Sequence, residues 1–166
     1  YNDRRNSCEN VAKAVQAKYP ERTINTLRDC TWEDLEEVKD KVSAEDIQRA
    51  TFVLGEKDRV LAVCEALNEG DYETVGQKMY ETHEGLSKDY EVSCEELDFL
   101  NEIAKENGVT GSRIMGGGFG GCTINLVKAP LYDKFIADAK AKFAAKYGHE
   151  PKVYDVVIGD GSRKIC

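Results

Sequence analysis

A run of glycines constrains this chain more than any other feature of its sequence. Five of the fourteen glycines lie within residues 116–121, in the stretch SRIMGGGFGGC that spans residues 112–122. Glycine inside a helix or strand is about 0.5–1 kcal/mol less favourable than alanine, so regular elements avoid such a run. Short segments with β-branched residues flank it at 109–115 and 122–127. We therefore predict a β-hairpin over residues 109–127 with a glycine loop at its tip.

Residues 1–108, which precede the hairpin, carry apolar positions at helical spacing almost throughout. Start signals for three helices stand at Thr31-Trp-Glu-Asp34, Ser43-Ala-Glu-Asp46 and Ser93-Cys-Glu-Glu96, of which the first and third read as capping boxes. Asp71 follows Gly70 and is predicted to cap a further helix. The sequence thus predicts a block of several helices ahead of the glycine loop.

The residues after the hairpin predict one more helix between Pro130 and Gly148, a strand at 152–158 (KVYDVVI) and a mobile tail at 159–166. The order is then a helical block followed by ββαβ. A ferredoxin-like sheet is built as βαββαβ, and the leading strand of that pattern is missing from this chain. We expect an α+β fold, a small antiparallel sheet with several helices packed on it, and a piece of a larger protein cut just after a strand.

The composition excludes several classes of function. A chain of 166 residues suffices for one domain with a core, and its net charge of −8 argues against nucleic-acid binding and against attraction to an anionic membrane. No stretch approaches the roughly 18 apolar residues of a membrane span, and no signal peptide is visible. Six scattered cysteines without a CxxC pair, and only two histidines, predict no metal site and a reducing, cytoplasmic environment.

Two common glycine-rich motifs do not fit the loop. Gly116, Gly118 and Gly121 match the spacing of the dinucleotide-binding fingerprint, but that fingerprint needs a helix directly after it, and the strand-like CTINLVK follows instead. Protein kinases place the same spacing on a hairpin over ATP, yet the V-A-I-K, H-R-D and D-F-G motifs are absent. Two interpretations stay open: glycines that only permit tight packing, or a backbone that closely approaches a ligand such as phosphate.

Three stretches together resemble the galactokinases of the GHMP small-molecule kinase superfamily. RIMGGGFGGC at 113–122 is similar to the C-terminal motif R-M-T-G-G-G-F-G-G-C, and YNDRRNSCENVA at 1–12 to a Y-N-x-R-R-x-x-C-E segment. The run from His83 to Asp98 resembles H-x-S-L-x-x-D-Y-x-V-S-x-x-E-L-D, and the GDGSRKIC tail loosely echoes the family's terminus. The resemblance spans essentially all of residues 1–166.

This resemblance implies a two-domain kinase with its active site in the cleft between the domains, of which residues 1–166 form the C-terminal GHMP kinase domain. The family's sugar-binding G-R-x-N-x-x-G-E-H-x-D and phosphate-binding G-L-S-S-S-A strings do not occur in this chain. The intact enzyme would transfer the γ-phosphoryl group of ATP to the C1 hydroxyl of galactose, with Mg²⁺. ATP and galactose would be held through the missing domain, which also carries the catalytic Asp and its partner Arg. We therefore expect no catalytic residue, metal ligand or bound cofactor in this chain, and no activity from it alone.

The site residues implied are those of the loop itself, which would approach the sugar and the transferring phosphate or brace the phosphate loop of the missing domain. Arg113 would support the loop, as would Met115, which stands where the family pattern has Thr. Two alternatives remain: a GHMP kinase for another small molecule, and a non-catalytic sensor or regulatory domain. An exposed sheet edge could also pair with a second copy of the chain. The loop residues are Gly116, Gly117, Gly118, Phe119, Gly120 and Gly121.

Structural roles are predicted for the remaining residues of note. His83 lies on an apolar stripe and is expected to be a hydrogen-bonded core histidine. Arg4 and Arg5 are expected to form structural ion pairs, because acidic residues are abundant. Cys122 is expected to be a small buried residue and not a nucleophile.

Overall fold

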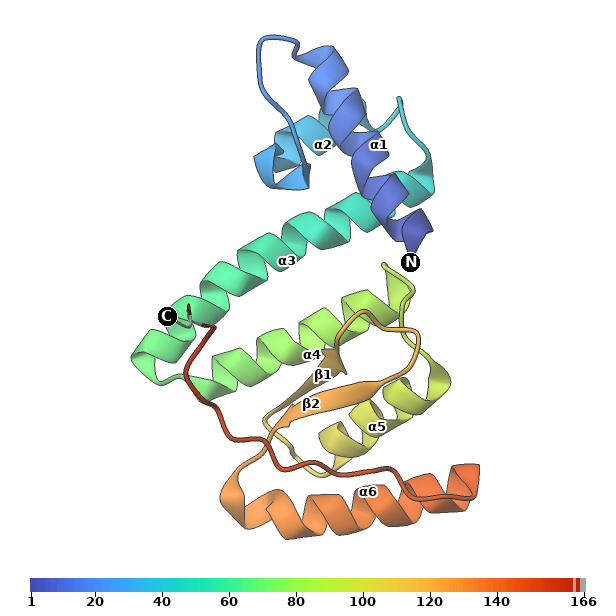
Figure 1. Ribbon diagram of the computed structural model, residues 1–166, viewed down its shortest axis with the longest axis vertical. Coiled ribbons are helices and arrows are strands. Elements are labelled where there is room, and N and C mark those ends of the chain that lie inside the picture. Colours follow the sequence, from blue (N-terminus) through green and yellow to red (C-terminus); the bar gives the residue numbers. More distant parts are fainter. Residues whose placement is uncertain (163, 165–166) are drawn as a thin grey trace.

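The computed structural model describes residues 1–162 and 164, and it divides into a helical lobe and a hairpin lobe joined through one long helix (Figure 1). The helices are α1 (Asn2–Lys18), α2 (Trp32–Val38), α3 (Ala44–Glu69), α4 (Tyr72–Lys88), α5 (Glu95–Glu106) and α6 (Tyr132–Tyr147), with 3₁₀ turns at Leu27–Asp29 and Ala129–Leu131; the strands are β1 (Gly111–Met115) and β2 (Cys122–Leu126). Figure 1 places α1 and α2 at one end of α3 and α4 beside it, with the hairpin, α5 and α6 on the side of α4 that faces away from α3.

The helical lobe packs one face of α1 against α2 and the first half of α3. Val11, Val15 and Val38 are fully buried at its centre. The predicted capping box is confirmed: the Thr31 hydroxyl accepts from the Asp34 amide, and the Asp34 carboxylate accepts from the Thr31 amide. Asp34 also receives two hydrogen bonds from Arg22, at 2.6 and 2.8 Å. That ion pair fixes the start of α2 to the loop that follows α1.

The hairpin lobe is held by close contact between α4 and β1. A Cβ atom added at Gly76 would lie 1.9 Å from the Thr110 carbonyl oxygen, so only glycine allows the helix to approach this closely. A second core, which includes Ile103, Ala104 and Phe135, joins α5 to α6 beside the sheet. α4 begins at the predicted cap, where Asp71 accepts from the Thr74 amide. These contacts make the helices a rigid support for the hairpin.

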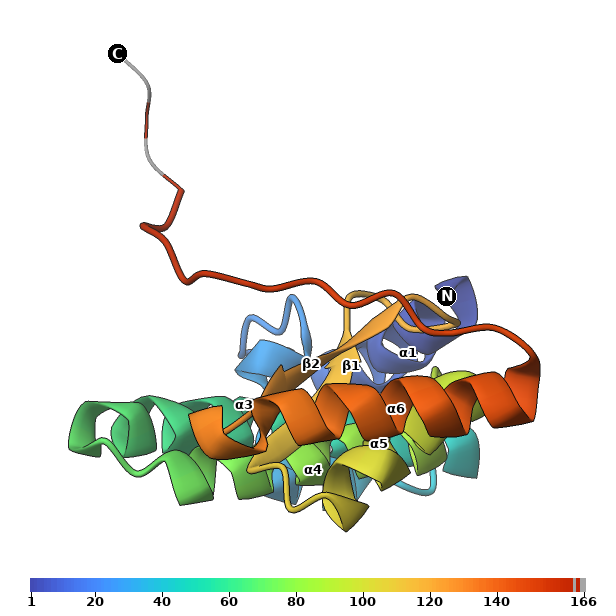
Figure 2. The same ribbon diagram turned by 90° about the horizontal axis from the view of Figure 1, so that it is seen from below.

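The sheet of the described residues has two strands, β1 and β2, which pair antiparallel from Gly111↔Leu126 to Met115↔Cys122. The predicted hairpin is therefore confirmed, but the predicted strand at 152–158 is wrong. That segment is extended without a ladder partner, and Ile158 is 100% exposed. Figure 2 shows it on the side of the hairpin opposite α4 and α5. A β-strand requires hydrogen bonds to a neighbouring strand, and the residue pattern of a segment does not determine whether such a neighbour is present.

A second correction concerns the start of α5. The predicted capping box at Ser93 does not form, because the helix is capped at Cys94 and no side chain bonds to its first amides. The Ser93 hydroxyl donates instead to the carboxylate of Asp98. Residues 159–162 of the predicted mobile tail are exposed, and its residues 163, 165 and 166 lie outside the described part. None of the helices described is both long and apolar enough to span a membrane.

Candidate functional site: the glycine loop and its support

The glycine loop, residues 116–121, follows a backbone path that side chains oppose. Gly116, Gly118, Gly120 and Gly121 have φ values of +89°, +78°, +117° and +100°, and Phe119 has +58°. Positive φ is disfavoured for residues with a Cβ atom and is routine for glycine. The density of glycine is therefore explained first by backbone conformation: four of its five glycines hold dihedral angles that other residues rarely adopt.

One face of the loop is packed against the connection between α4 and α5. A Cβ at Gly118 would lie 2.3 Å from the Val92 carbonyl oxygen, and the Phe119 amide donates to that same oxygen at 2.6 Å. A Cβ at Gly117 would lie 3.5 Å from the Tyr1 ring. By contrast, a Cβ at Gly120 would meet no atom within 4 Å. The loop thus combines a packed face with an open one: tight packing accounts for Gly118, while the approach of the open face to a ligand stays a prediction.

Arg4 joins the three stretches that resemble galactokinases. Its Nε donates to the Tyr90 carbonyl at 2.9 Å and its Nη2 to the Glu91 carbonyl at 2.6 Å. Its guanidinium carbon also lies 5.6 Å from the centre of the Phe119 ring, within the range of a cation–π contact. The start of α1, the α4–α5 connection and the loop tip therefore meet at one side chain.

Glu91 lies between two arginines in this support. It has a φ of +52° and, with Phe119, is one of two non-glycine residues with positive φ among those described. Its carboxylate lies 3.6 Å from Nη2 of Arg49 and 4.0 Å from Nη2 of Arg4. Arg49 is buried, donates to the Ser7 hydroxyl at 3.0 Å and also pairs with Glu45. The unusual backbone at Glu91 is thus held by charge from both α1 and α3.

Tyr90 anchors the same connection to the helical lobe. Its ring stacks on Phe52 with centroids 5.1 Å apart, and its hydroxyl lies 3.8 Å from the Cys8 sulfur. Burial raises the pKa of the Tyr90 phenol, and burial likewise raises the pKa of the Cys8 thiol. Both groups stay protonated near neutral pH, so neither is suited to act as a base or nucleophile.

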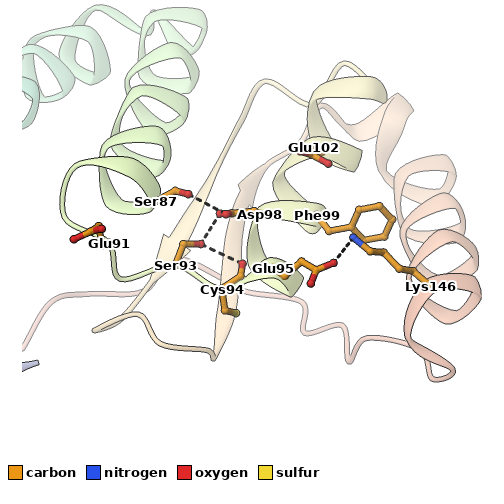
Figure 3. A pocket seen from close by; sticks show the side chains of 9 residues that line it. All are labelled: Ser87, Glu91, Ser93, Cys94, Glu95, Asp98, Phe99, Glu102 and Lys146. Atoms are coloured by element: carbon orange, nitrogen blue, oxygen red, sulfur yellow. Dashed lines mark hydrogen bonds and ion pairs between the residues drawn. The ribbon is translucent and has the colours of Figure 1, made fainter.

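A polar network around Asp98 links the end of α4 to the start of α5, next to the connection between these two helices (Figure 3). Ser87 donates to the Asp98 carboxylate at 2.9 Å, and Nε2 of His83 lies 3.1 Å from it. Figure 3 shows Ser87 and Ser93 both pointing to Asp98. Burial lowers the pKa of His83, and the charge of Asp98 opposes that shift less strongly. His83 is therefore a neutral, hydrogen-bonded core histidine, as predicted.

The pocket of about 530 Å³ beside this network is a poor site for phosphate. Its walls carry four carboxylates and a single cationic side chain, that of Lys146, which pairs with Glu95 at 2.8 Å. A multiply charged anion would meet like charges on several sides. The four carboxylates belong to Glu91, Glu95, Asp98 and Glu102.

The other predicted residues lie as follows. Arg113 donates to the Ile114 carbonyl at 3.1 Å, so the contact found is to its own strand, and its support of the loop stays a prediction. Met115 is half-exposed at the base of the loop, opposite Cys122, which is partly buried. Arg5 forms the predicted ion pair, with Glu9 at 2.7 Å, and this pair lies at the surface.

Sequence reasoning does not find the residues that support the loop. It predicts an ion pair for Arg4, yet the short contacts of this side chain are to two backbone carbonyls. It also gives no role to Val92 and Tyr1, which face Gly118 and Gly117. The sequence offers one indication of this support, which is that all three galactokinase-like stretches occur in the same chain. Their spacing along the chain does not predict that they contact one another in the fold.

Comparison with known proteins decides the family. A family model described as GHMP kinases C terminal matches residues 63–145, half of the chain. The chain belongs to the GHMP kinase family. The galactokinase of Clostridium acetobutylicum is 43% identical over 167 residues, covering 99% of this chain and 42% of that protein. The galactokinase of Homo sapiens is 40% identical and is matched over 100% of this chain and 40% of its own length.

The solved structures agree with this assignment. The fold matches Lactococcus lactis galactokinase complexed with galactose with a TM-score of 0.80 and 29% identity, over 90% of this chain and 38% of that one. The predicted α+β fold of a GHMP kinase C-terminal domain and the resemblance to galactokinases are both confirmed. The chain spans about two fifths of the length of these relatives. That residues 1–166 form a single such domain remains a prediction.

Proposed function

We propose that this chain is the C-terminal part of a galactokinase, which transfers the γ-phosphoryl group of ATP to the C1 hydroxyl of galactose. Relatives named galactokinase align over almost the whole chain, at 40–43% identity in the two cases above. The observation that carries the proposal is the loop: a run of glycines in left-handed conformations, fixed on one face and open on the other. Phosphoryl transfer depends mainly on positioning and charge stabilisation, which such a backbone can serve.

The loop, residues 116–121, would form one wall of a cleft whose other wall belongs to the rest of the protein. Its open face would approach the sugar and the transferring phosphate, or brace the phosphate loop of the other domain. The described residues contain no group of three or more His, Cys, Asp or Glu side chains that could hold a metal ion. ATP and Mg²⁺ are proposed as requirements of the whole protein because metal ions neutralise the charge that develops when a γ-phosphoryl group is transferred, and no catalytic residue is assigned to this chain.

The test is turnover by the full-length protein. With ATP, Mg²⁺ and galactose, we expect formation of ADP and galactose 1-phosphate in equal amounts. A panel of other sugars and of other GHMP kinase substrates identifies the alternative in which a different small molecule is phosphorylated. Binding of galactose and ATP without turnover would instead favour the sensor or regulatory alternative.

The same assay applied to residues 1–166 alone is expected to give no product, because the proposed sugar and ATP contacts lie in the missing domain. Turnover by a preparation free of contaminating kinase would contradict this.

A cytoplasmic location is also proposed, since five cysteines of the described residues are free. Its check is the location of the full-length protein after cell fractionation.

A further inference from the structure

We propose that Arg4 is a positioning residue that fixes the glycine loop for phosphoryl transfer, an inference that rests on the proposed function. Arg4 would act through residues 116–121 and not by touching the substrate itself. Three observations lead to it: the pair of bonds from its guanidinium to the backbone, its contact with the loop tip, and the strained conformations on both sides of it.

The two hydrogen bonds of Arg4 hold consecutive carbonyls, those of Tyr90 and Glu91. The next residue, Val92, accepts the amide of Phe119 through its own carbonyl at 2.6 Å. Within the described residues, this is the backbone hydrogen bond that ties the loop to a segment outside the hairpin. The position of the loop tip is therefore set by where Arg4 holds residues 90 and 91.

The cation also meets the loop directly. Its guanidinium lies 5.6 Å from the Phe119 ring centre, and the Arg4 side chain is only 16% exposed. Phe119 is 52% exposed, so its ring is only half covered and the guanidinium lies beside it at the loop tip. A planar guanidinium holds its donors in a rigid fork and has a flat face, so it suits two carbonyls and a ring together better than the compact ammonium of a lysine does.

Backbone strain sits on both sides of this contact. Glu91 and Phe119 have φ values of +52° and +58°. Arg4 donates a hydrogen bond to the Glu91 carbonyl, and its guanidinium lies beside the Phe119 ring. Such conformations persist only where surrounding contacts over-determine them, and they concentrate at functional sites. Removing Arg4 should let both residues relax and the loop depart from its position.

The neighbouring Arg5 provides a matched control. It has the same charge and lies on the same helix turn, but its side chain is 71% exposed and pairs with Glu9 on the surface. Arg4→Ala and Arg5→Ala therefore remove equal charge from one end of α1, and only the first removes contacts to the loop and its support.

The experiment compares the two variants in the full-length protein by hydrogen–deuterium exchange of residues 116–121 and by steady-state kinetics. Arg4→Ala is expected to speed exchange in the loop and to lower kcat by about 10–100-fold, since misplacement by about 1 Å has costs of that size. Arg5→Ala should change neither. Arg4→Lys should behave like Arg4→Ala, and added ethylguanidinium, but not ethylammonium, should restore part of the turnover of Arg4→Ala.

The outcomes separate this inference from the proposed function. Unchanged exchange at 116–121 in folded Arg4→Ala protein would overturn the positioning role. Faster exchange with unchanged kcat would support positioning and refute the part of the loop in catalysis. If Arg4→Ala fails to fold, Arg4→Gln, which keeps an amide donor group but neither the charge nor the guanidinium fork, is read in the same way. Wild-type behaviour of Arg4→Lys would also contradict the inference, because it would show that charge alone suffices.

Discussion

Gly118 shows at the scale of one residue why the loop is built from glycine. Two constraints coincide there: a φ of +78° and a backbone oxygen, that of Val92, where a Cβ would be placed. Gly148, which ends α6, shares the φ of +78° but would meet no atom within 4 Å. The two positions therefore separate the cost of the conformation from the cost of the close approach.

We predict that Gly118→Ala harms the full-length protein more than Gly148→Ala does. Both should lose about 1–2 kcal/mol of stability from the left-handed conformation, and Gly118→Ala should lose more because the loop must leave Val92. Its turnover should also fall by about 10–100-fold, while Gly148→Ala retains wild-type turnover. Urea unfolding and kcat measure the two effects. Equal losses in both variants would show that the contact with Val92 does not matter.

His83 makes a second residue-scale prediction, through its lowered pKa. In the unfolded chain His83 takes up a proton near its usual pKa of about 6.5, whereas the folded site resists protonation. The unfolded state then binds more protons, so stability should be full above a pH of about 6.5 and fall as pH decreases below it. His83→Gln should make this fall shallower between about pH 7.5 and 5, compared by urea midpoints.

If His83→Gln and the wild type show the same slope, burial of His83 does not contribute to acid sensitivity. The apolar stripe predicts the core role of His83, but the Asp98 carboxylate that accepts its hydrogen bond cannot be read from periodicity.

At the scale of elements, local signals predict the helices well because each carries its own start and end. Thr31 and Asp71 cap helices as expected, and Gly148 ends α6 with a φ of +78°. The strand predicted at 152–158 is wrong because its pairing depends on a neighbour and not on its own residues. The predicted Ser93 cap is wrong for a similar reason, since Asp98 competes for the same hydroxyl.

The close contact between α4 and β1 leads to a prediction about the stability of the fold. Gly76→Ala should lower stability by about 1–3 kcal/mol, because the added methyl group overpacks against the Thr110 carbonyl. Gly55→Ala on α3 is the matched control: its new methyl meets only the flexible end of Arg59, at 3.2 Å. That change should raise stability by up to about 1 kcal/mol through helix propensity. Urea unfolding of the full-length protein would contradict the packing argument if both variants gained stability.

At the scale of the whole molecule, the site is only partly predictable. The glycine loop can be found from the sequence because its composition is unusual. Its support cannot, because Arg4 and Glu91 are ordinary residues whose contacts span 87 positions of the chain. The second wall of the proposed cleft would come from the remaining length of the protein, since this chain spans about two fifths of the length of its relatives.

The exposed segment after α6 and the two-stranded sheet lead to a prediction about self-association. Beyond α6 the extended segment exposes Val156, Val157 and Ile158, and among the residues that the structure describes β1 and β2 pair only with each other. Unpaired edges and exposed β-branched segments favour pairing between chains. We predict that residues 1–166 expressed alone self-associate, seen by light scattering as a mass that rises with concentration. The Ser112 carbonyl on β1 is already bonded by Asn101, so the exposed segment should dominate the association.

Val157→Lys tests that surface, and Leu61→Lys on the exposed face of α3 is its control. Both replace an exposed apolar side chain by a charge, but only Val157 lies in the extended segment. Val157→Lys should shift the isolated chain to monomer, because a charge on an edge segment opposes pairing, while Leu61→Lys should associate like the wild type. A monomer at all concentrations in the wild type would exclude self-association. Association abolished by Leu61→Lys alone would place the interface on α3 and not on the extended segment.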